Sequence, residues 1–259
     1  GAGLYENQYV VARGESNLNQ SALARVLGKE GKLHRILDLK EPVWGIKPRN
    51  KEQHFALDAL LRDEIKLVSL IGKAGTGKTL LAIAVGLQKV AEEQAFTRLL
   101  VSRPIFPLGK DIGYLPGDIE DKLSPWMQPI HDNVELLLGL GKSGNRGGRS
   151  YRDLIDQGLM EVEPLTYIRG RSIPNQFMIV DEAQNLTPHE VKTIITRCGE
   201  GTKIVLTGDP YQIDNPYVDS VNNGLAYISE KFKNTRLAAM ITLVKGERSE
   251  LAELAANIL

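Results

Sequence analysis

The sequence predicts an α/β fold in which a parallel β-sheet carries helices on both faces. Compact apolar runs alternate along the chain with amphipathic segments, which is typical of strands that are buried on both sides of a sheet. Of the 259 residues, 42% are hydrophobic and 25% are charged, so the chain holds enough apolar material for a full core. This composition excludes a disordered or fibrous chain.

Residues 1–45 predict a small N-terminal extension or linker with short strands. Alternating stretches at 9–12 and 33–37 predict the strands, and residues 20–27 predict one short helix. The opening Gly1-Ala2-Gly3 has no initiating Met, which indicates a fragment of a longer protein.

Residues 46–259 predict the main domain, with each strand a compact apolar run and each helix an amphipathic stretch. The expected strands are 66–71, 98–102, 177–181, 203–207 and 239–243. The expected helices are 51–62, 78–93, 119–139, 188–197, 217–232 and 249–259. Pro and Gly predict an irregular loop at 103–118, and residues 141–150 predict a flexible basic linker. Pro125 and Pro129 are expected to bend or divide their helix.

Charge and cysteine content exclude several classes of protein. The 32 basic residues balance 32 acidic residues, so any nucleic-acid site must be a local patch. The single cysteine, Cys198, excludes an intrachain disulfide and a cysteine-rich zinc site. No apolar run approaches the ~18 residues of a membrane span, so a cytoplasmic protein without membrane contact is expected.

A glycine-rich turn, Gly72-Lys73-Ala74-Gly75-Thr76-Gly77-Lys78-Thr79, fits the phosphate-loop pattern G-x-x-x-x-G-K-[ST] at every position. It lies between a predicted strand and a predicted helix, the setting in which this pattern binds nucleotide phosphates. Backbone N–H groups of Gly72, Ala74, Gly75, Thr76 and Gly77 are expected to surround phosphate oxygens. Lys78 is expected to reach the β- and γ-phosphates, and the Thr79 hydroxyl to bind Mg²⁺.

Two carboxylates, Asp181 and Glu182, follow the apolar run at 177–180. The strand would carry them to the carboxyl edge of the sheet, beside the phosphate loop. Asp181 is expected to hold Mg²⁺ through water, and Glu182 to activate the attacking water. A solvated strand end is the alternative for two acids alone, but the phosphate loop upstream favours the catalytic interpretation.

Three segments resemble motifs of superfamily 1 helicases. Asp181-Glu182-Ala183-Gln184-Asn185 is similar to their second motif, and Gly208-Asp209-Pro210-Tyr211-Gln212 to their third, G-D-x-x-Q. The resemblance implies a RecA-like core in which Gln212 senses the γ-phosphate. Residues 243–249 resemble the segment that holds a phosphate-sensing arginine, which implies this role for Arg248, although G-E-R-S replaces the usual N-Y-R-S.

The stretch from about residue 45 to the end resembles the PhoH-like ATPase family more closely still. The resemblance lies in the phosphate loop and in residues 50–53, 102–105, 111–117 and 208–214. It implies binding of ATP and Mg²⁺, and hydrolysis coupled to remodelling of single-stranded RNA, with DNA as the other candidate. It also implies a ring of subunits, with six expected, and in one branch an upstream PIN-type nuclease domain.

Four further residues are candidates for ligand contact. Gln53 precedes the phosphate loop by about 20 residues, and the helicase resemblance implies that it reads adenine; a solvent-facing helical Gln is the alternative. Arg103, Lys110 and Tyr114 lie in the loop after the second strand, where cations and an aromatic ring suit single-stranded nucleic acid. A structured surface loop is the alternative for these three.

Three functions from different classes remain open. The first is an ATP-driven RNA translocase; because the chain has length for one core only, a neighbouring subunit would close the site. The second is a small-molecule phosphotransferase, which the Glu after the Asp disfavours. The third is an ATP-gated switch that regulates another domain without unwinding.

Overall fold

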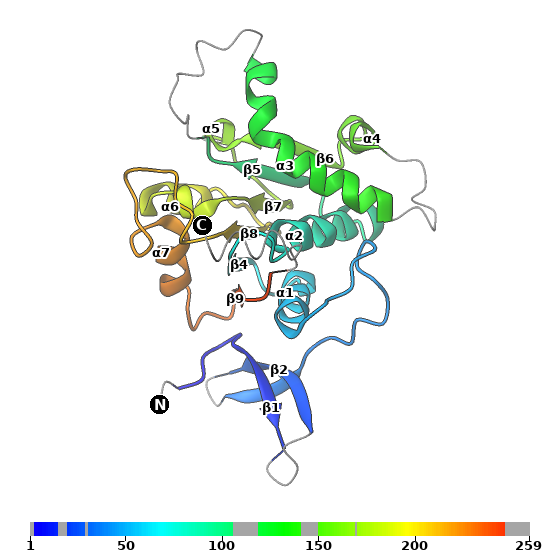
Figure 1. Ribbon diagram of the computed structural model, residues 1–259, viewed down its shortest axis with the longest axis vertical. Coiled ribbons are helices and arrows are strands. Elements are labelled where there is room, and N and C mark those ends of the chain that lie inside the picture. The colour runs from blue at the N-terminus through cyan, green and yellow to red at the C-terminus, as the bar shows by residue number, and fades with distance from the viewer. Residues whose placement is uncertain are drawn as a thin grey trace, which may run out of the picture.

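The computed structural model of the chain has two sheets (Figure 1). It describes residues 3–14, 20–28, 31–105, 119–140, 150–168 and 170–246. The larger sheet has six parallel strands in the order β6-β5-β7-β8-β4-β9. Their bounds are β4 Leu67–Gly72, β5 Leu99–Arg103, β6 Met160–Pro164, β7 Phe177–Val180, β8 Lys203–Gly208 and β9 Ala238–Leu243.

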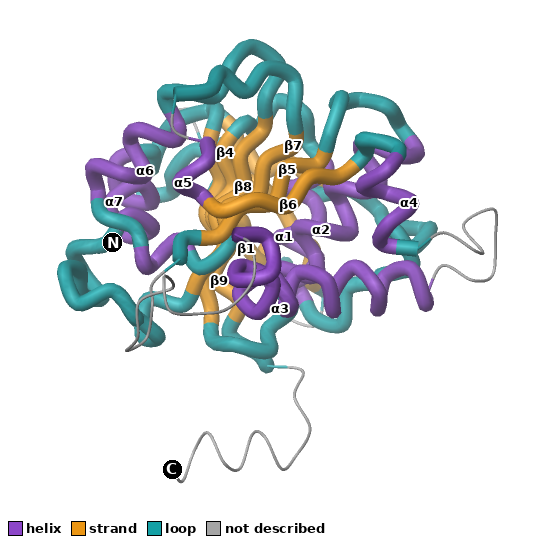
Figure 2. Tube along the Cα trace, turned by 90° about the horizontal axis from the view of Figure 1, so that it is seen from above, coloured by secondary structure: helices purple, strands orange, loops and turns teal. Residues whose placement is uncertain are grey.

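Helices cover both faces of this sheet, as predicted (Figure 2). On one face lie α1 (Lys51–Leu61), α2 (Lys78–Leu87) with its π-helical end (Gln88–Glu92), α3 (Ile119–Leu140) and α4 (Tyr151–Asp156). On the other lie α5 (Leu165–Ile168), α6 (Pro188–Ile195) and α7 (Gly224–Lys231). A short 3₁₀ turn, η4, spans Ala183–Asn185.

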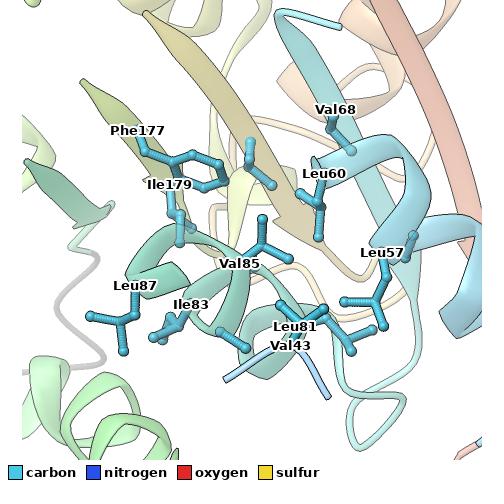
Figure 3. Close-up of a cluster of buried hydrophobic side chains, with 14 of the residues drawn as sticks. Val43, Leu57, Leu60, Val68, Leu81, Ile83, Val85, Leu87, Phe177 and Ile179 are labelled. Carbon is cyan, nitrogen blue, oxygen red and sulfur yellow. The ribbon is translucent and has the colours of Figure 1, made fainter. Parts of the chain in front are cut away.

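Strand β7 shows why the core divides into two layers. Successive side chains of a strand point to opposite faces. Phe177 and Ile179 accordingly pack with α1 and α2, as Figure 3 shows, whereas Met178 and Val180 pack with α6 and α7. All four side chains are buried, which explains the continuous apolar run in the sequence.

The smaller sheet is antiparallel and contains β1 (Tyr9–Arg13), β2 (Ser21–Leu27) and β3 (Lys32–Arg35) in that order. The helix predicted at 20–27 is wrong, because these residues form the central strand. Their Ala, Leu and Arg favour a helix locally, but hydrogen bonding to strands on both sides outweighs that preference.

Figure 1 shows the N-terminal sheet below β9 and α1. Asn7, just before the sheet, contacts β9, and Tyr9 in β1 contacts α1. The amide of Asn7 donates to the carbonyl oxygen of Ala238 at 2.9 Å and to that of Arg236 at 3.0 Å. Val43 and Trp44 are buried in the core beside α1 and α2. The division at residue 45 remains a prediction.

Several other expectations need correction. Strand β6 and helices α4 and α5 were not predicted. Helix α7 begins at Gly224 rather than 217, because the Asn223 side chain accepts the hydrogen bond that starts it. Helix α3 runs without a break from Ile119 to Leu140, so Pro125 and Pro129 do not divide it; a bend there stays a prediction. The linker at 141–149 and the helix at 249–259 lie outside the described residues. Within the described part of the chain, no helix has the length and apolar character that crossing a bilayer requires.

Candidate active site

The phosphate loop joins the end of β4 to the start of α2. Gly75 and Gly77 have φ values of 82° and 90°, in the left-handed region that favours glycine. Gly72 is required for another reason: a Cβ there would lie 2.3 Å from the carbonyl oxygen of Leu243 in β9. The Lys78 ammonium donates to the carbonyl oxygens of Gly72 at 2.6 Å and Lys73 at 3.0 Å. Lys78 therefore lies across the loop, and its contact with the β- and γ-phosphates stays a prediction.

Two hydroxyls converge on Asp181. Thr79 Oγ1 donates to Asp181 Oδ1 at 2.7 Å, and Thr207 Oγ1, from the end of β8, donates to the same oxygen at 2.5 Å. The structure thus brings together the two predicted Mg²⁺ ligands. A hydroxyl and a carboxylate are hard oxygen donors, so the set suits Mg²⁺ bound through few protein ligands and phosphate. The sequence did not predict a role for Thr207, because it ends β8 whereas its partner Asp181 follows the neighbouring strand β7.

Glu182 has a φ of 55°, which is rare for a residue with a side chain and indicates local strain. Its Oε2 accepts a hydrogen bond from Gln184 Nε2 at 2.5 Å. Burial raises the pKa of Glu182, and the neighbouring charge of Asp181 raises it further; the Gln184 hydrogen bond, Arg103 and Lys78 oppose this.

Gln184 links the two acidic motifs. Its Nε2 also donates to the carbonyl oxygen of Gln212 at 2.8 Å, and its Oε1 accepts from the Asp209 N–H at 3.2 Å. The side chain is fully buried. The sequence showed Gln184 within the second motif but assigned it no role, because two of its three partners, Asp209 and Gln212, lie more than 20 residues away.

Most of the predicted phosphate, metal and catalytic residues that the structure describes line one cavity of about 280 Å³, whereas Gly72 and Thr76 of the phosphate loop do not line it. Gln212 and Arg103 line the same cavity. Its wall includes Ala74, Gly75, Gly77, Lys78, Thr79, Arg103, Asp181, Glu182, Asp209 and Gln212.

Gln53 is buried against the phosphate loop and is not solvent-facing. Its Nε2 donates to the Thr76 carbonyl oxygen at 3.3 Å, and its Oε1 accepts from the Arg49 N–H at 2.9 Å. The adenine contact stays a prediction; in this structure both ends of the amide bind protein groups. Arg248, Lys110 and Tyr114 lie outside the described residues.

A strand, phosphate loop and helix, with an acidic pair on a parallel strand of the same sheet, define the chain as a P-loop NTPase. The PhoH family model, described as PhoH-like protein, matches residues 45–258, and the chain belongs to this family.

Several relatives are called Protein PhoH2, among them one from Bacillus subtilis and one from Thermobispora bispora. The one from Bacillus subtilis is 55% identical over 256 residues, which are 98% of this chain and 57% of the relative. The one from Thermobispora bispora is 40% identical over 240 residues, 92% of this chain and 52% of the relative. The chain therefore spans about half the length of the relatives that it matches.

Similar solved structures include the Pif1 helicase from Candida albicans and the SWI2/SNF2 ATPase core from Sulfolobus solfataricus. Each has a TM-score of 0.41 and 17% identity. The first match covers 82% of this chain and 43% of that one, and the second covers 80% and 47%.

Proposed function

We propose that the chain is a Mg²⁺-dependent ATPase whose hydrolysis is coupled to binding and remodelling of single-stranded RNA. One observation supports hydrolysis above the others. Glu182, a carboxylate without a role in holding phosphate, lines the same cavity as Lys78, Thr79 and Asp181. A base beside the metal-binding aspartate favours attack by water over transfer to a bound acceptor molecule.

In the proposed reaction, a water oxygen forms a bond to the γ-phosphorus as the bond from that phosphorus to the β,γ-bridging oxygen breaks. ADP leaves with the bonding electron pair, and the proton of the water passes to Glu182. Lys78 and the loop N–H groups donate to the negatively charged phosphate oxygens. Mg²⁺, held by Thr79 and Asp181, would neutralise further charge on the phosphate oxygens.

Coupling to RNA is supported by family membership and by the Gln184 link between Glu182 and the loop that holds Gln212. A ring of subunits, with six proposed, would supply the missing side of a site built from a single core. We also propose a cytoplasmic location and an upstream PIN-type nuclease domain, since the chain spans about half of its relatives.

A switch without unwinding is the second candidate, and helix α1 favours it. Gln53 contacts the phosphate loop from one end of α1, while Asp58 contacts the N-terminal sheet from its middle. A structural change in the phosphate loop on nucleotide binding or hydrolysis could therefore pass through α1 to the N-terminal sheet, and from there to the proposed upstream domain.

The test is ATP hydrolysis with Mg²⁺, alone and with single-stranded RNA or DNA. Wild type is compared with Lys78→Ala and with Lys192→Ala, which changes an exposed lysine on α6. Hydrolysis lost only in Lys78→Ala and stimulated by RNA supports the proposal. A hydrolysis rate that neither RNA nor DNA changes favours the switch. The absence of hydrolysis in wild type contradicts both proposed functions. Light scattering that shows a monomer with and without nucleotide contradicts the ring.

A further inference from the structure

Arg103 lies beside Glu182 because their strands are neighbours. Strand β5 pairs with β7, with Ser102 opposite Val180, and the Asp181 N–H donates to the Ser102 carbonyl oxygen at 2.9 Å. Arg103 and Glu182 therefore leave the sheet at the same edge. The Arg103 guanidinium donates to Glu182 Oε1 at 3.4 Å.

A second nitrogen of the same guanidinium contacts helix α3. It donates to the Trp126 carbonyl oxygen at 3.3 Å. Helix α3 also supplies Pro129 and Asn133 to the wall of the phosphate cavity, and Figure 1 shows it passing β5. The planar fork of arginine suits this arrangement, because separate nitrogens can serve two partners at once.

The Glu182 carboxylate is thus held on both oxygens. Arg103 contacts Oε1, and Gln184 contacts Oε2. The side chain of Arg103 is 20% exposed and that of Glu182 is 33% exposed, so the ion pair lies at the rim of the cavity with partial access to water. Displacing a catalytic carboxylate by about 1 Å can slow a reaction by ~10²-fold, so these two contacts bear directly on hydrolysis.

We propose that Arg103 is a positioning residue, which holds Glu182 for attack by water and ties it to α3. This role differs from the nucleic-acid contact expected from the sequence, which stays an alternative outcome of the test, and it rests on the proposed ATPase function. A displacement of α3 would be transmitted through one side chain to the catalytic base. Helix α3 would then set the rate of hydrolysis without touching the reacting atoms.

The test compares Arg103→Gln and Arg103→Lys with a matched control, Arg98→Gln. Arg98 precedes the same strand at its other end, where it pairs with Glu161, and it does not line the phosphate cavity. Arg103→Gln is expected to lower kcat by ~10–100-fold while KM for ATP and affinity for a fluorescent ADP analogue change less than about two-fold. Arg103→Lys should recover part of kcat, because it keeps the charge. Arg98→Gln should match wild type.

A second readout follows α3 without catalysis. Trp126 on α3 is half-buried, whereas Trp44 is fully buried, so acrylamide quenching reports chiefly on Trp126. Quenching should increase in both Arg103 variants, since one lysine nitrogen cannot span both partners, and stay unchanged in Arg98→Gln.

Three results overturn the inference. Unchanged kcat and quenching in Arg103→Gln would show that the contacts have no consequence. A rise in KM alone would make Arg103 a phosphate ligand, and loss of RNA stimulation alone would make it a nucleic-acid contact. If wild type hydrolyses no ATP, the proposed function fails, and the quenching comparison still decides whether Arg103 holds α3.

Discussion

The Tyr9 hydroxyl donates to the Asp58 carboxylate at 2.7 Å, and this contact joins the N-terminal sheet to helix α1. Asp58 is fully buried and also accepts hydrogen bonds from the Leu37 N–H and from the Arg62 guanidinium. Burial of the hydroxyl raises the pKa of Tyr9, and the Asp58 charge raises it further, so the phenol stays protonated as a donor.

Removing this donor should destabilise the protein. We expect Tyr9→Phe to lower the free energy of unfolding by ~1.5–3 kcal/mol, because it deletes a hydrogen bond to a charged, buried acceptor. Urea unfolding measures the change. Tyr167→Phe is the control, because Tyr167 is 49% exposed and should cost less than about 0.5 kcal/mol. Equal values for both variants would show that the contact does not hold the sheet to α1.

A buried lysine predicts a pH dependence of stability. Lys203 donates to the carbonyl oxygens of Ala59 at 3.0 Å and Arg62 at 2.8 Å, and burial lowers its pKa to about 7. In the unfolded chain the pKa is ~10.4, so between pH 7 and 10 the unfolded state binds more protons. Stability from this group therefore rises with pH across that window and is lost as pH falls toward 7.

Urea unfolding of wild type and Lys203→Met at several pH values isolates this effect, because other titrating groups cancel in the difference. We expect wild type to gain stability relative to the variant from pH 7 to 10. A constant difference would mean that Lys203 keeps its proton in the folded state.

We predict that β4 can pack against β9 without strain only if residue 72 is glycine. A Cβ in Gly72→Ala would meet the backbone of β9 at Leu243, so we expect a loss of ~1–3 kcal/mol without any nucleotide present. Gly139 on α3 has open space around it, and Gly139→Ala should stabilise the helix by ~0.5–1 kcal/mol. Thermal unfolding compares the two. An unchanged midpoint for Gly72→Ala would contradict the predicted clash.

Gln184 is predicted to couple the two acidic motifs. Gln184→Leu removes the donor to Glu182 and to the loop of Gln212, and should lower kcat by ~10²-fold with ADP affinity unchanged. Gln176, at the opposite end of β7, supplies the matched control Gln176→Leu, because its buried Oε1 has no hydrogen-bond partner among the residues that the structure describes. Steady-state kinetics of both variants provide the measurement. A full rate for Gln184→Leu would show that the hydrogen bonds are not needed for hydrolysis.

The sequence predicted the strands that are compact apolar runs, which are β4, β5, β7, β8 and β9. Strand β6 escaped prediction because Glu161 and Glu163 interrupt its apolar character; as an edge strand it pairs these acids with Arg98 and Arg171. Strand β2 was not predicted because its residues favour a helix; it is a strand because it hydrogen-bonds to β1 on one side and β3 on the other.

For the site, local motifs predicted the residues that we expect to bind phosphate or activate water, since their chemistry depends on spacing within one turn. Thr207 and Arg103 contact side chains that follow a neighbouring strand, and Gln184 contacts the backbone of Asp209 and Gln212 after β8; these contacts arise from strand order. A single sequence does not specify that order. Arg103 was therefore predicted as a ligand contact of the loop that follows it, whereas the structure places it in the phosphate cavity.

The most direct test of the proposed function is single-turnover hydrolysis of ATP by wild type, Glu182→Gln and Glu163→Gln. Glu163 lies in the edge strand β6, does not line the phosphate cavity, and is the matched control. We expect Glu182→Gln to bind ATP with affinity similar to or tighter than wild type but to hydrolyse it at least ~10²-fold more slowly, with Glu163→Gln like wild type. Hydrolysis by Glu182→Gln at the wild-type rate would contradict the proposal that Glu182 activates the attacking water.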